Sequence, residues 1–101
     1  MYVVVQHKFK NPDEVFSRGE KLIKNEGAPR GVRGLQFYPS KDHSIAVCLW
    51  EGESIADVQK YVDTMLGDAA EQTYYEIDGQ WAFARQPSGL GELPAAVARA
   101  A

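Results

Sequence analysis

The sequence lacks most of the features that would assign a chemistry directly. It has one cysteine, Cys48, so no disulfide can form within the chain, and we expect a protein of the reducing cytoplasm. No signal-peptide pattern is visible near Met1. No apolar run approaches the roughly 20 residues that a membrane-spanning helix needs, so no membrane partner is expected.

Sequence motifs for cofactors and metals are also missing. There is no phosphate-binding loop, dinucleotide motif, nucleophile elbow or HExxH zinc motif. The side chains that could bind a soft or borderline metal are few, and their spacing matches no zinc motif; they are His7, His43, Cys48 and Glu76. We therefore expect neither a metal nor a cofactor.

The charge is nearly balanced, with 11 basic and 14 acidic residues and a net charge of −3. Residues 1–41 hold eight basic and four acidic residues, whereas residues 42–101 hold three and ten. Because a compact domain interleaves these two parts, we interpret the imbalance as a solvated surface. The chain offers no basic footprint for nucleic acid.

The order of strand-like and helix-like segments is the strongest positive signal. The first strand carries the β-branched run Val3 to Val5, and the first helix begins with Asn11 as N-cap and Pro12 in its first turn. The segments follow the order β-α-β-β-α-β, with strands over 2–9, 32–39, 44–50 and 73–77 and helices over 12–26 and 55–66. This order predicts an α+β, ferredoxin-like domain over residues 1–78, with an antiparallel sheet of strand order 4-1-3-2 and both helices on one face.

Residues 79–101 fit no element of that pattern. They contain an alternating aromatic segment, a linker with glycine and proline, and an alanine-rich end that is weakly typical of a short helix over 94–101. We interpret this part as a C-terminal extension.

Alternation of side chains predicts two apolar faces for the sheet. The predicted helix-facing set is Val3, Val5, Leu35, Phe37, Ile45, Val47, Leu49, Tyr75 and Ile77. The predicted opposite set is Tyr2, Val4, Gln6, Tyr38, Cys48, Trp50, Tyr74 and Glu76. The opposite set is too aromatic to remain in water, so we predict a homodimer in which two sheets face each other around a cavity. A register error of one residue would reverse these sets.

The element order, the length and the aromatic second face resemble the dimeric α/β-barrel superfamily. The strings VVQH (4–7), CLWE (48–51) and YYEID (74–78) are similar to those of small uncharacterised members. More distantly, the chain resembles the antibiotic-biosynthesis-type monooxygenases. The resemblance covers residues 1–78 and implies a barrel of two copies, with residues 79–101 packing on the partner subunit.

Two residues are candidates for acid–base chemistry. His7 lies near the end of the first strand, where it can reach the rim of the cavity and act as a general base. Glu76 lies on the predicted cavity face, where desolvation would raise the pKa of its carboxyl. The alternatives are a structural histidine and an ion pair of Glu76 with Lys8 or Arg33 across the dimer.

The predicted ligand-binding residues line the opposite face: Gln6, Tyr38, Cys48, Trp50 and Tyr74. The aromatic members suit either a box for a planar ligand or packing between subunits, and Cys48 in apolar surroundings is expected to be inert. Three functions remain open: binding of a small apolar or aromatic molecule, cofactor-independent oxygenation of an aromatic substrate, and dimerisation without catalysis.

Overall fold

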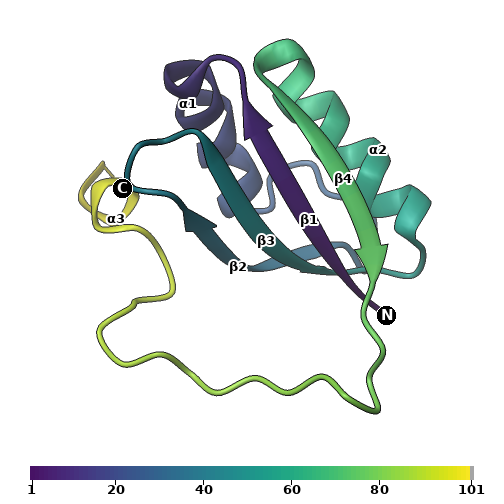
Figure 1. Ribbon diagram of the computed structural model, residues 1–101. Coiled ribbons are helices and arrows are strands. Elements are labelled where there is room, and N and C mark those ends of the chain that lie inside the picture. Colours follow the sequence, from purple (N-terminus) through teal and green to yellow (C-terminus); the bar gives the residue numbers. More distant parts are fainter. Residues whose placement is uncertain (101) are drawn as a thin grey trace.

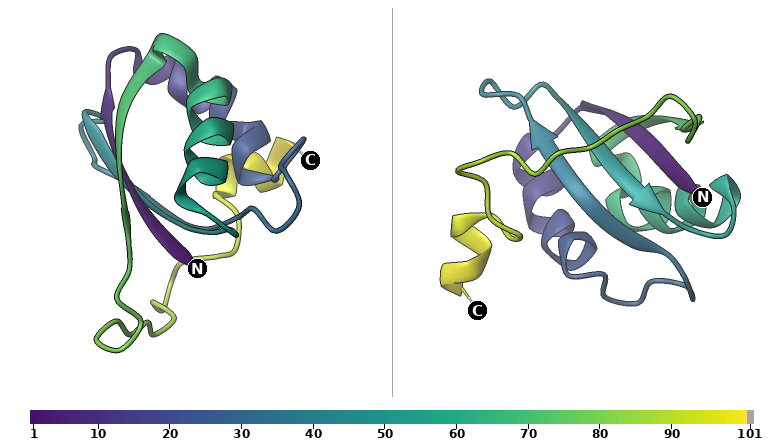
Figure 2. Two further views of the ribbon diagram at one scale, coloured as in Figure 1. Left: turned by 90° about the vertical axis from the view of Figure 1, so that its right-hand side faces the viewer. Right: turned by 90° about the horizontal axis from the view of Figure 1, so that it is seen from below.

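The computed structural model describes the backbone of residues 1–100 and the side chains of residues 1–97. One antiparallel sheet has the strand order β2-β3-β1-β4, which confirms the predicted order. The elements are β1 (Tyr2–Phe9), α1 (Pro12–Ile23), β2 (Arg33–Pro39), β3 (Ile45–Glu51), α2 (Ile55–Leu66), η1 (Gly67–Ala69), β4 (Ala70–Glu76) and α3 (Ala95–Ala100). Helices α1 and α2 cover one face of this ferredoxin-like sheet, as Figures 1 and 2 show.

Helix α1 begins as predicted but ends earlier. The Asn11 side chain accepts a hydrogen bond from the Glu14 backbone N–H at 3.2 Å, which satisfies one of the free N–H groups of the first turn. The helix was predicted to run to residue 26 and ends at Ile23. Asn25 adopts a left-handed φ of 57°, and its side-chain oxygen accepts from the Gly34 N–H at 2.8 Å. Asparagine tolerates this conformation, so it redirects the chain before Gly27 does.

Helix α2 has the predicted bounds. Its first turn is capped by Ser54, whose hydroxyl accepts from the Asp57 N–H at 3.1 Å, and Gly67 follows its last residue with a φ of 55°. Among the described helices, none combines the length and apolarity that a bilayer crossing would require.

Strand β4 begins three residues before its predicted start. Its first residue, Ala70, pairs with Phe9, and Glu71 pairs with Lys8. The polar residues Glu71 and Gln72 give this part of the strand little β signal in the sequence. Hydrogen bonds to β1 hold these residues in the strand, although their own β propensity is low.

The core lies between the sheet and the two helices. Its largest fully buried side chains are Val3, Val5, Val58, Val62 and Leu66. Each such side chain contributes roughly 1.5–3 kcal/mol relative to an exposed position. The left view of Figure 2 shows the sheet edge-on with both helices packed on one side, so the opposite side of the sheet carries no helix.

The predicted facing of β3 is wrong. Residues paired across an antiparallel sheet share a face, and β1 pairs Val3 with Trp50 and Val5 with Cys48. Trp50 and Cys48 therefore face the helices, where both are buried, while Ile45 and Val47 are exposed on the other side.

Close packing explains why Trp50 fits on the helix side. Its ring meets that of Tyr61 on α2 edge-on, with centroids 5.8 Å apart. Its neighbour on β2 is Gly34, where a Cβ atom would lie 3.2 Å from the Trp50 ring. The missing side chain of Gly34 leaves room for the indole.

The predicted facing of β4 is also wrong. Tyr74 pairs with Val5 and packs against the core, whereas Tyr75, which was predicted to face the helices, is half exposed on the other side. In β2 the prediction holds for Phe37, which packs against the core, and for Tyr38, which is exposed. Leu35 was also predicted to face the helices, but it lies at a register shift where Gly34 takes the position opposite Trp50.

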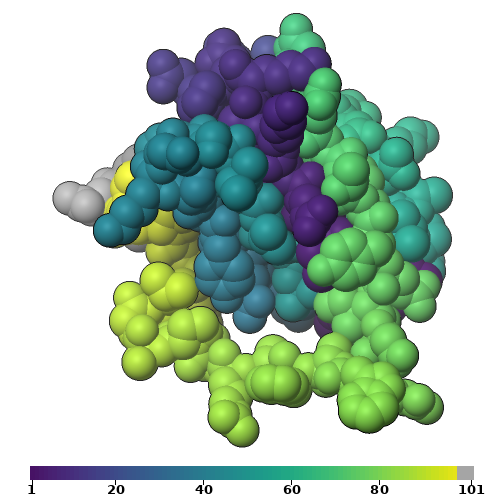
Figure 3. Space-filling view, viewed as in Figure 1, coloured from purple at the N-terminus to yellow at the C-terminus, as the bar shows by residue number. Residues whose placement is uncertain are grey.

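The C-terminal extension consists of an arm over residues 77–94 and the short helix α3. The helix confirms the one predicted over 94–101, and its Val97 is buried. Figure 1 shows the arm leaving the end of β4 and running below the sheet to α3 on the β2 side. In Figure 3 an open gap separates the middle of the arm from the body of the domain.

Candidate functional site

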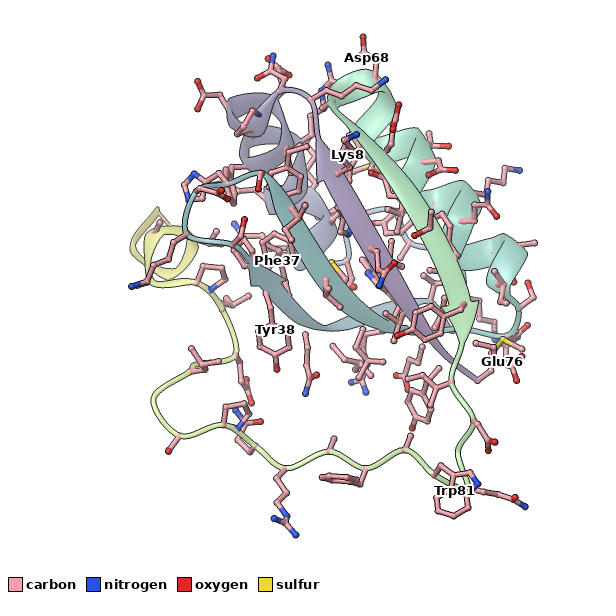
Figure 4. All side chains as sticks on the ribbon, in the orientation of Figure 1. Lys8, Phe37, Tyr38, Asp68, Glu76 and Trp81 are labelled. Atoms are coloured by element: carbon pink, nitrogen blue, oxygen red, sulfur yellow. The ribbon has the colours of Figure 1, made fainter. Side chains whose placement is uncertain are left out.

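The predicted site residues divide between the two faces of the sheet. We call the surface opposite the helices the open face; it carries Gln6 and Tyr38, as predicted. The helix side carries His7 and also three residues predicted to face the other way, Cys48, Trp50 and Tyr74. Glu76 was also predicted to face away from the helices, but it pairs with Val3 and therefore lies on the helix side. It is exposed there, at the end of β4, as Figure 4 shows.

The open face is strongly apolar. Five large hydrophobic side chains on it are each about half exposed: Tyr2, Tyr38, Ile45, Val47 and Tyr75. They come from all four strands, so they form one surface across the sheet. An apolar surface of this kind on a soluble domain usually marks an interface or a binding site.

A shallow hollow of about 580 Å³ lies on the open face near the β2–β3 turn. The open-face residues around it are Gln6, Lys8, Ile45, Val47, Glu71 and Thr73. The Thr73 hydroxyl donates to the Gln6 side-chain oxygen at 3.2 Å, and Lys8 lies opposite Glu71 across the β1–β4 pair. The hollow therefore combines an apolar wall from β3 with polar groups from β1 and β4.

A second group of polar side chains lies on the helix side, and we call it the buried polar chain: Cys48 and His7, which are buried, and Gln72, Asp63 and Tyr74, which are half-buried. The Cys48 Sγ lies 2.9 Å from His7 Nε2, and His7 Nδ1 lies 3.3 Å from Gln72 Oε1. Gln72 Nε2 donates to Asp63 Oδ1 at 3.0 Å, and the Tyr74 hydroxyl donates to the same oxygen at 2.6 Å.

The contacts fix which group donates and which accepts in each hydrogen bond of the buried polar chain. Gln72 donates its amide N–H to Asp63, so its oxygen faces His7 and accepts from a protonated Nδ1. His7 Nε2 is then the acceptor for the Cys48 thiol. Burial lowers the pKa of His7, against the opposing effects of the Gln72 hydrogen bond and the Asp63 charge, and burial raises the pKa of Cys48 to about 12. Imidazole and thiol are both neutral at pH 7.

The buried polar chain ties α2 to the sheet. His7 is only 5% exposed and both of its ring nitrogens are engaged. Asp63 on α2 accepts from two side chains of β4, and burial, followed by the hydrogen bond to Asp63, raises the pKa of Tyr74. Within residues 1–97, no buried side-chain nitrogen or oxygen is left without a partner. The arrangement positions helix against strand and leaves Cys48 as a thiol without nucleophilic character.

The structure does not bring the two predicted acid–base residues together. His7 pairs with Gln72, whereas Glu76 pairs with Val3, four residues away along β1. At about 3.3 Å per residue this places them roughly 13 Å apart. Arg33, one predicted partner of Glu76, instead donates to Glu51 at 2.7 Å. The catalytic roles of His7 and Glu76 stay predictions.

Sequence reasoning missed two members of the buried polar chain and most of the hollow. Gln72 lay outside the predicted strand, although it shares a face with Tyr74 two residues on. Asp63 directly follows the buried Val62 on α2. A carboxylate so close to the core was the one sign in the sequence that Asp63 would need a polar partner. The lining of the hollow by Lys8, Val47, Glu71 and Thr73 depends on strand pairing rather than on any local pattern.

The lowered pKa of His7 predicts a loss of stability in mild acid. The unfolded chain takes up a proton at this residue as the pH falls below 6.5, the ordinary pKa of a histidine, while the folded chain resists protonation. The free energy of unfolding should therefore decrease as the pH is lowered from 7 to 5. Urea denaturation at these two pH values measures the change.

His7→Gln should show a smaller decrease than the unmodified chain over that range. His43→Asn is the matched control, because His43 lies in the β2–β3 turn with a φ of 59°, which asparagine tolerates. An identical pH dependence in all three proteins would contradict the role given to His7.

Comparison with known proteins gives a limited result. No family model matches the sequence, and no curated protein matches it. Among solved structures, the chain is similar to Rv0793 from Mycobacterium tuberculosis. The TM-score is 0.47 at 16% sequence identity, and the alignment covers 75% of this chain and 93% of that chain. The fold assignment above stands on the element order and strand pairing of the chain itself.

Proposed function

We propose that the chain acts as a homodimer whose two open faces meet and hold a small, mainly apolar molecule between them. The observation that carries this proposal is the apolar open face, with its hollow and without a covering helix. A second copy offers a surface of the same chemistry and shape. Two-fold pairing of identical patches is the commonest route to a closed oligomer.

The charges of the open face support self-association. Lys8 on β1 and Glu71 on β4 lie on this face, at one end of the sheet. A two-fold axis that lies in the interface and runs along β1 and β4 would bring Lys8 of one copy toward Glu71 of the other, in competition with the ion pair of 3.0 Å that Glu71 makes with Lys10 of its own chain. Such complementarity orients the partners and disfavours other arrangements.

The hollow indicates the kind of ligand. A volume of about 580 Å³ lies within the range of roughly 300–1,000 Å³ that is typical of small-molecule sites. Ile45 and Val47 supply apolar contact, while Gln6 and Thr73 supply hydrogen-bonding groups. These groups favour a small apolar molecule with one or two polar atoms, for which Gln6 keeps its predicted binding role. Tyr38 lies beside Val47 on the same face and outside the lining of the hollow.

The geometry supports binding more than oxygenation. A cofactor-independent monooxygenase needs a base that is open to its substrate. His7 lies on the helix side with both ring nitrogens engaged, and Glu76 lies away from the hollow at the exposed end of β4. Dimerisation without a ligand is the remaining alternative. The experiment below distinguishes it from ligand binding.

Native mass spectrometry of the chain purified from its source cell tests the proposal. We expect a dimer that retains a bound small molecule. Thr73→Phe should fill the hollow and reduce the retained molecule by about tenfold or more, because one lost site contact or overlap is worth over 1.4 kcal/mol.

Thr64→Phe is the matched control, since Thr64 is also an exposed threonine but lies on α2, beside α1 and on the opposite side of the sheet. It should retain the molecule as the unmodified chain does. A dimer that carries no bound molecule would contradict the proposed ligand binding and would support a protein that only dimerises. Equal retention of the molecule by both variants would show that it binds outside the hollow.

A further inference from the structure

The open-face residues of the hollow form three parallel columns, one on each of the strands β3, β1 and β4. Strand pairing sets their members side by side in two rows: Val47, Gln6 and Thr73 in one row, and Ile45, Lys8 and Glu71 in the next. Neighbouring columns are about 4.8 Å apart and neighbouring rows about 7 Å apart. A small molecule in the hollow therefore contacts columns of different chemistry at the same time.

The β3 column is apolar and accessible. Ile45 is 56% exposed and Val47 is 41% exposed. Because the two side chains project from one strand two residues apart, they form a single apolar strip about 7 Å long. This strip suits the hydrocarbon part of a small molecule.

Lys8, in the central column, is a cation without a carboxylate partner. Among the described residues around the hollow, Glu71 is the one acid, and its Oε1 lies 3.0 Å from Lys10 Nζ. The pKa of the Glu71 carboxyl is lowered mainly by the hydrogen bond to Lys10 and the charge of Lys10, and Lys8 contributes least. Within residues 1–97, Lys8 Nζ makes no ion pair. Figure 4 shows Lys8 near the end of β1.

The surplus charge persists when two open faces meet. At this end of the sheet each copy has two positive charges, on Lys8 and Lys10, and one negative charge, on Glu71. Whichever lysine Glu71 pairs with, in its own copy or in the other, one positive charge per copy remains without a counter-charge. Burying such a charge between two sheets is costly unless an anion accompanies it.

The polar groups beside Lys8 offer donors rather than acceptors. The Thr73 hydroxyl donates to Gln6 Oε1 at 3.2 Å, which engages an acceptor of the hollow. Gln6 Nε2 has no partner within residues 1–97, so both of its N–H groups are available, about 7 Å from Lys8 along β1. An ionised carboxylate only accepts hydrogen bonds, and it therefore complements both side chains.

We propose that the molecule held on the open face is a small carboxylic acid in its ionised form. Its hydrocarbon part lies on Ile45 and Val47, and its carboxylate lies at Lys8. This inference deepens the proposed function and rests on it. One surplus positive charge per copy matches a carboxylate, whereas a phosphate monoester carries about 1.5 to 2 negative charges at pH 7.

Two probes that differ only in the head group test the inference. Octanoate carries the carboxylate, and octanamide has the same carbon chain without a charge. Each is titrated at pH 7 into the ¹⁵N-labelled chain, and the amide shifts of residues 6–8, 45–47 and 71–73 report both the Kd and the place of binding. We expect octanoate to bind about tenfold more tightly than octanamide. This preference should decrease as salt is added.

Lys8→Met should remove the preference, because methionine keeps an unbranched apolar side chain and loses the charge. The octanoate Kd should rise about tenfold, while the octanamide Kd should change less than about twofold. Lys60→Met is the matched control, since Lys60 is an exposed lysine of α2 on the opposite side of the sheet. It should bind both probes as the unmodified chain does.

Glu71→Gln should change the affinity in the opposite direction. Without this carboxylate, Lys8 and Lys10 both lack a counter-charge, so octanoate should bind about threefold more tightly and octanamide as before. A variant that folds poorly cannot produce this gain. Weaker binding of octanoate by Glu71→Gln would overturn the inference.

The remaining outcomes separate this inference from the proposed function. Equal affinity for octanoate and octanamide at the hollow overturns the carboxylate and leaves the binding function intact. Equal loss of the preference in Lys8→Met and Lys60→Met also overturns it, because the net charge of the chain would then be the cause. If neither probe shifts the residues of the hollow, the proposed binding site is contradicted, and this inference with it.

Discussion

Replacing Trp50 by aspartate should abolish cooperative folding. The indole is 4% exposed, packs against Tyr61 and fills the space left by Gly34. Removing a buried tryptophan costs about 3–5 kcal/mol, and burying an unpaired carboxylate adds a further penalty of several kcal/mol. Because a small domain has roughly 5–15 kcal/mol of stability in total, the variant should show no cooperative urea transition by circular dichroism.

Trp50→Asp also tests the facing of β3, since Val47 lies three residues earlier in the same strand but on the open face. Val47→Asp should keep a cooperative transition. If Trp50→Asp folds as well as Val47→Asp, the assignment of Trp50 to the core is wrong.

Val47→Asp should separate the proposed dimer into folded monomers. Val47 is 41% exposed and pairs with Gln6 and Tyr38 across neighbouring strands, which places it within the open face. A two-fold interface brings the substitution in from both copies, so two carboxylates enter an apolar contact without a partner. The dimer Kd should rise about 100-fold or more, which sedimentation equilibrium measures.

Thr64→Asp is the control for added negative charge, because it changes an exposed residue of α2 on the opposite side of the sheet. Its Kd should match that of the unmodified chain. A dimer that persists unchanged in Val47→Asp would exclude the open face as the interface.

The bounds of β1 and α2 could be predicted because local signals agree with the tertiary structure there. In β1, the valine run 3–5 favours a strand, and the polar residues Gln6 and Lys8 alternate with buried Val5 and His7. In α2, a serine cap and a following glycine mark both ends. The element order followed from such signals, and with it the ferredoxin-like topology.

The facing of β3 could not be predicted because both of its faces are apolar. Ile45 and Val47 are as hydrophobic as Ala46 and Cys48, so alternation alone does not say which set meets the helices. The decision comes from pairing with β1, which aligns Trp50 with Val3. The large indole of Trp50 then fills the space beside Gly34. Local sequence does not reveal this contact, because the two residues are distant in the chain.

The same limit applies to the site. Cys48 and His7 are 41 residues apart and meet at 2.9 Å only because the β1–β3 register aligns their strands. Gln72 joins them through the β1–β4 register. The side chains that are capable of acid–base or binding chemistry could be named from the sequence. Their division between the buried polar chain and the open face depends on which strands pair and in which register.

Sedimentation velocity of the unmodified chain, over a hundredfold range of concentration, tests the central claim most directly. The claim is that the apolar open face is covered by a second copy. The predicted result is a single species with twice the 11.2 kDa mass of one chain at the higher concentrations. A stable 11.2 kDa monomer throughout the range would contradict it.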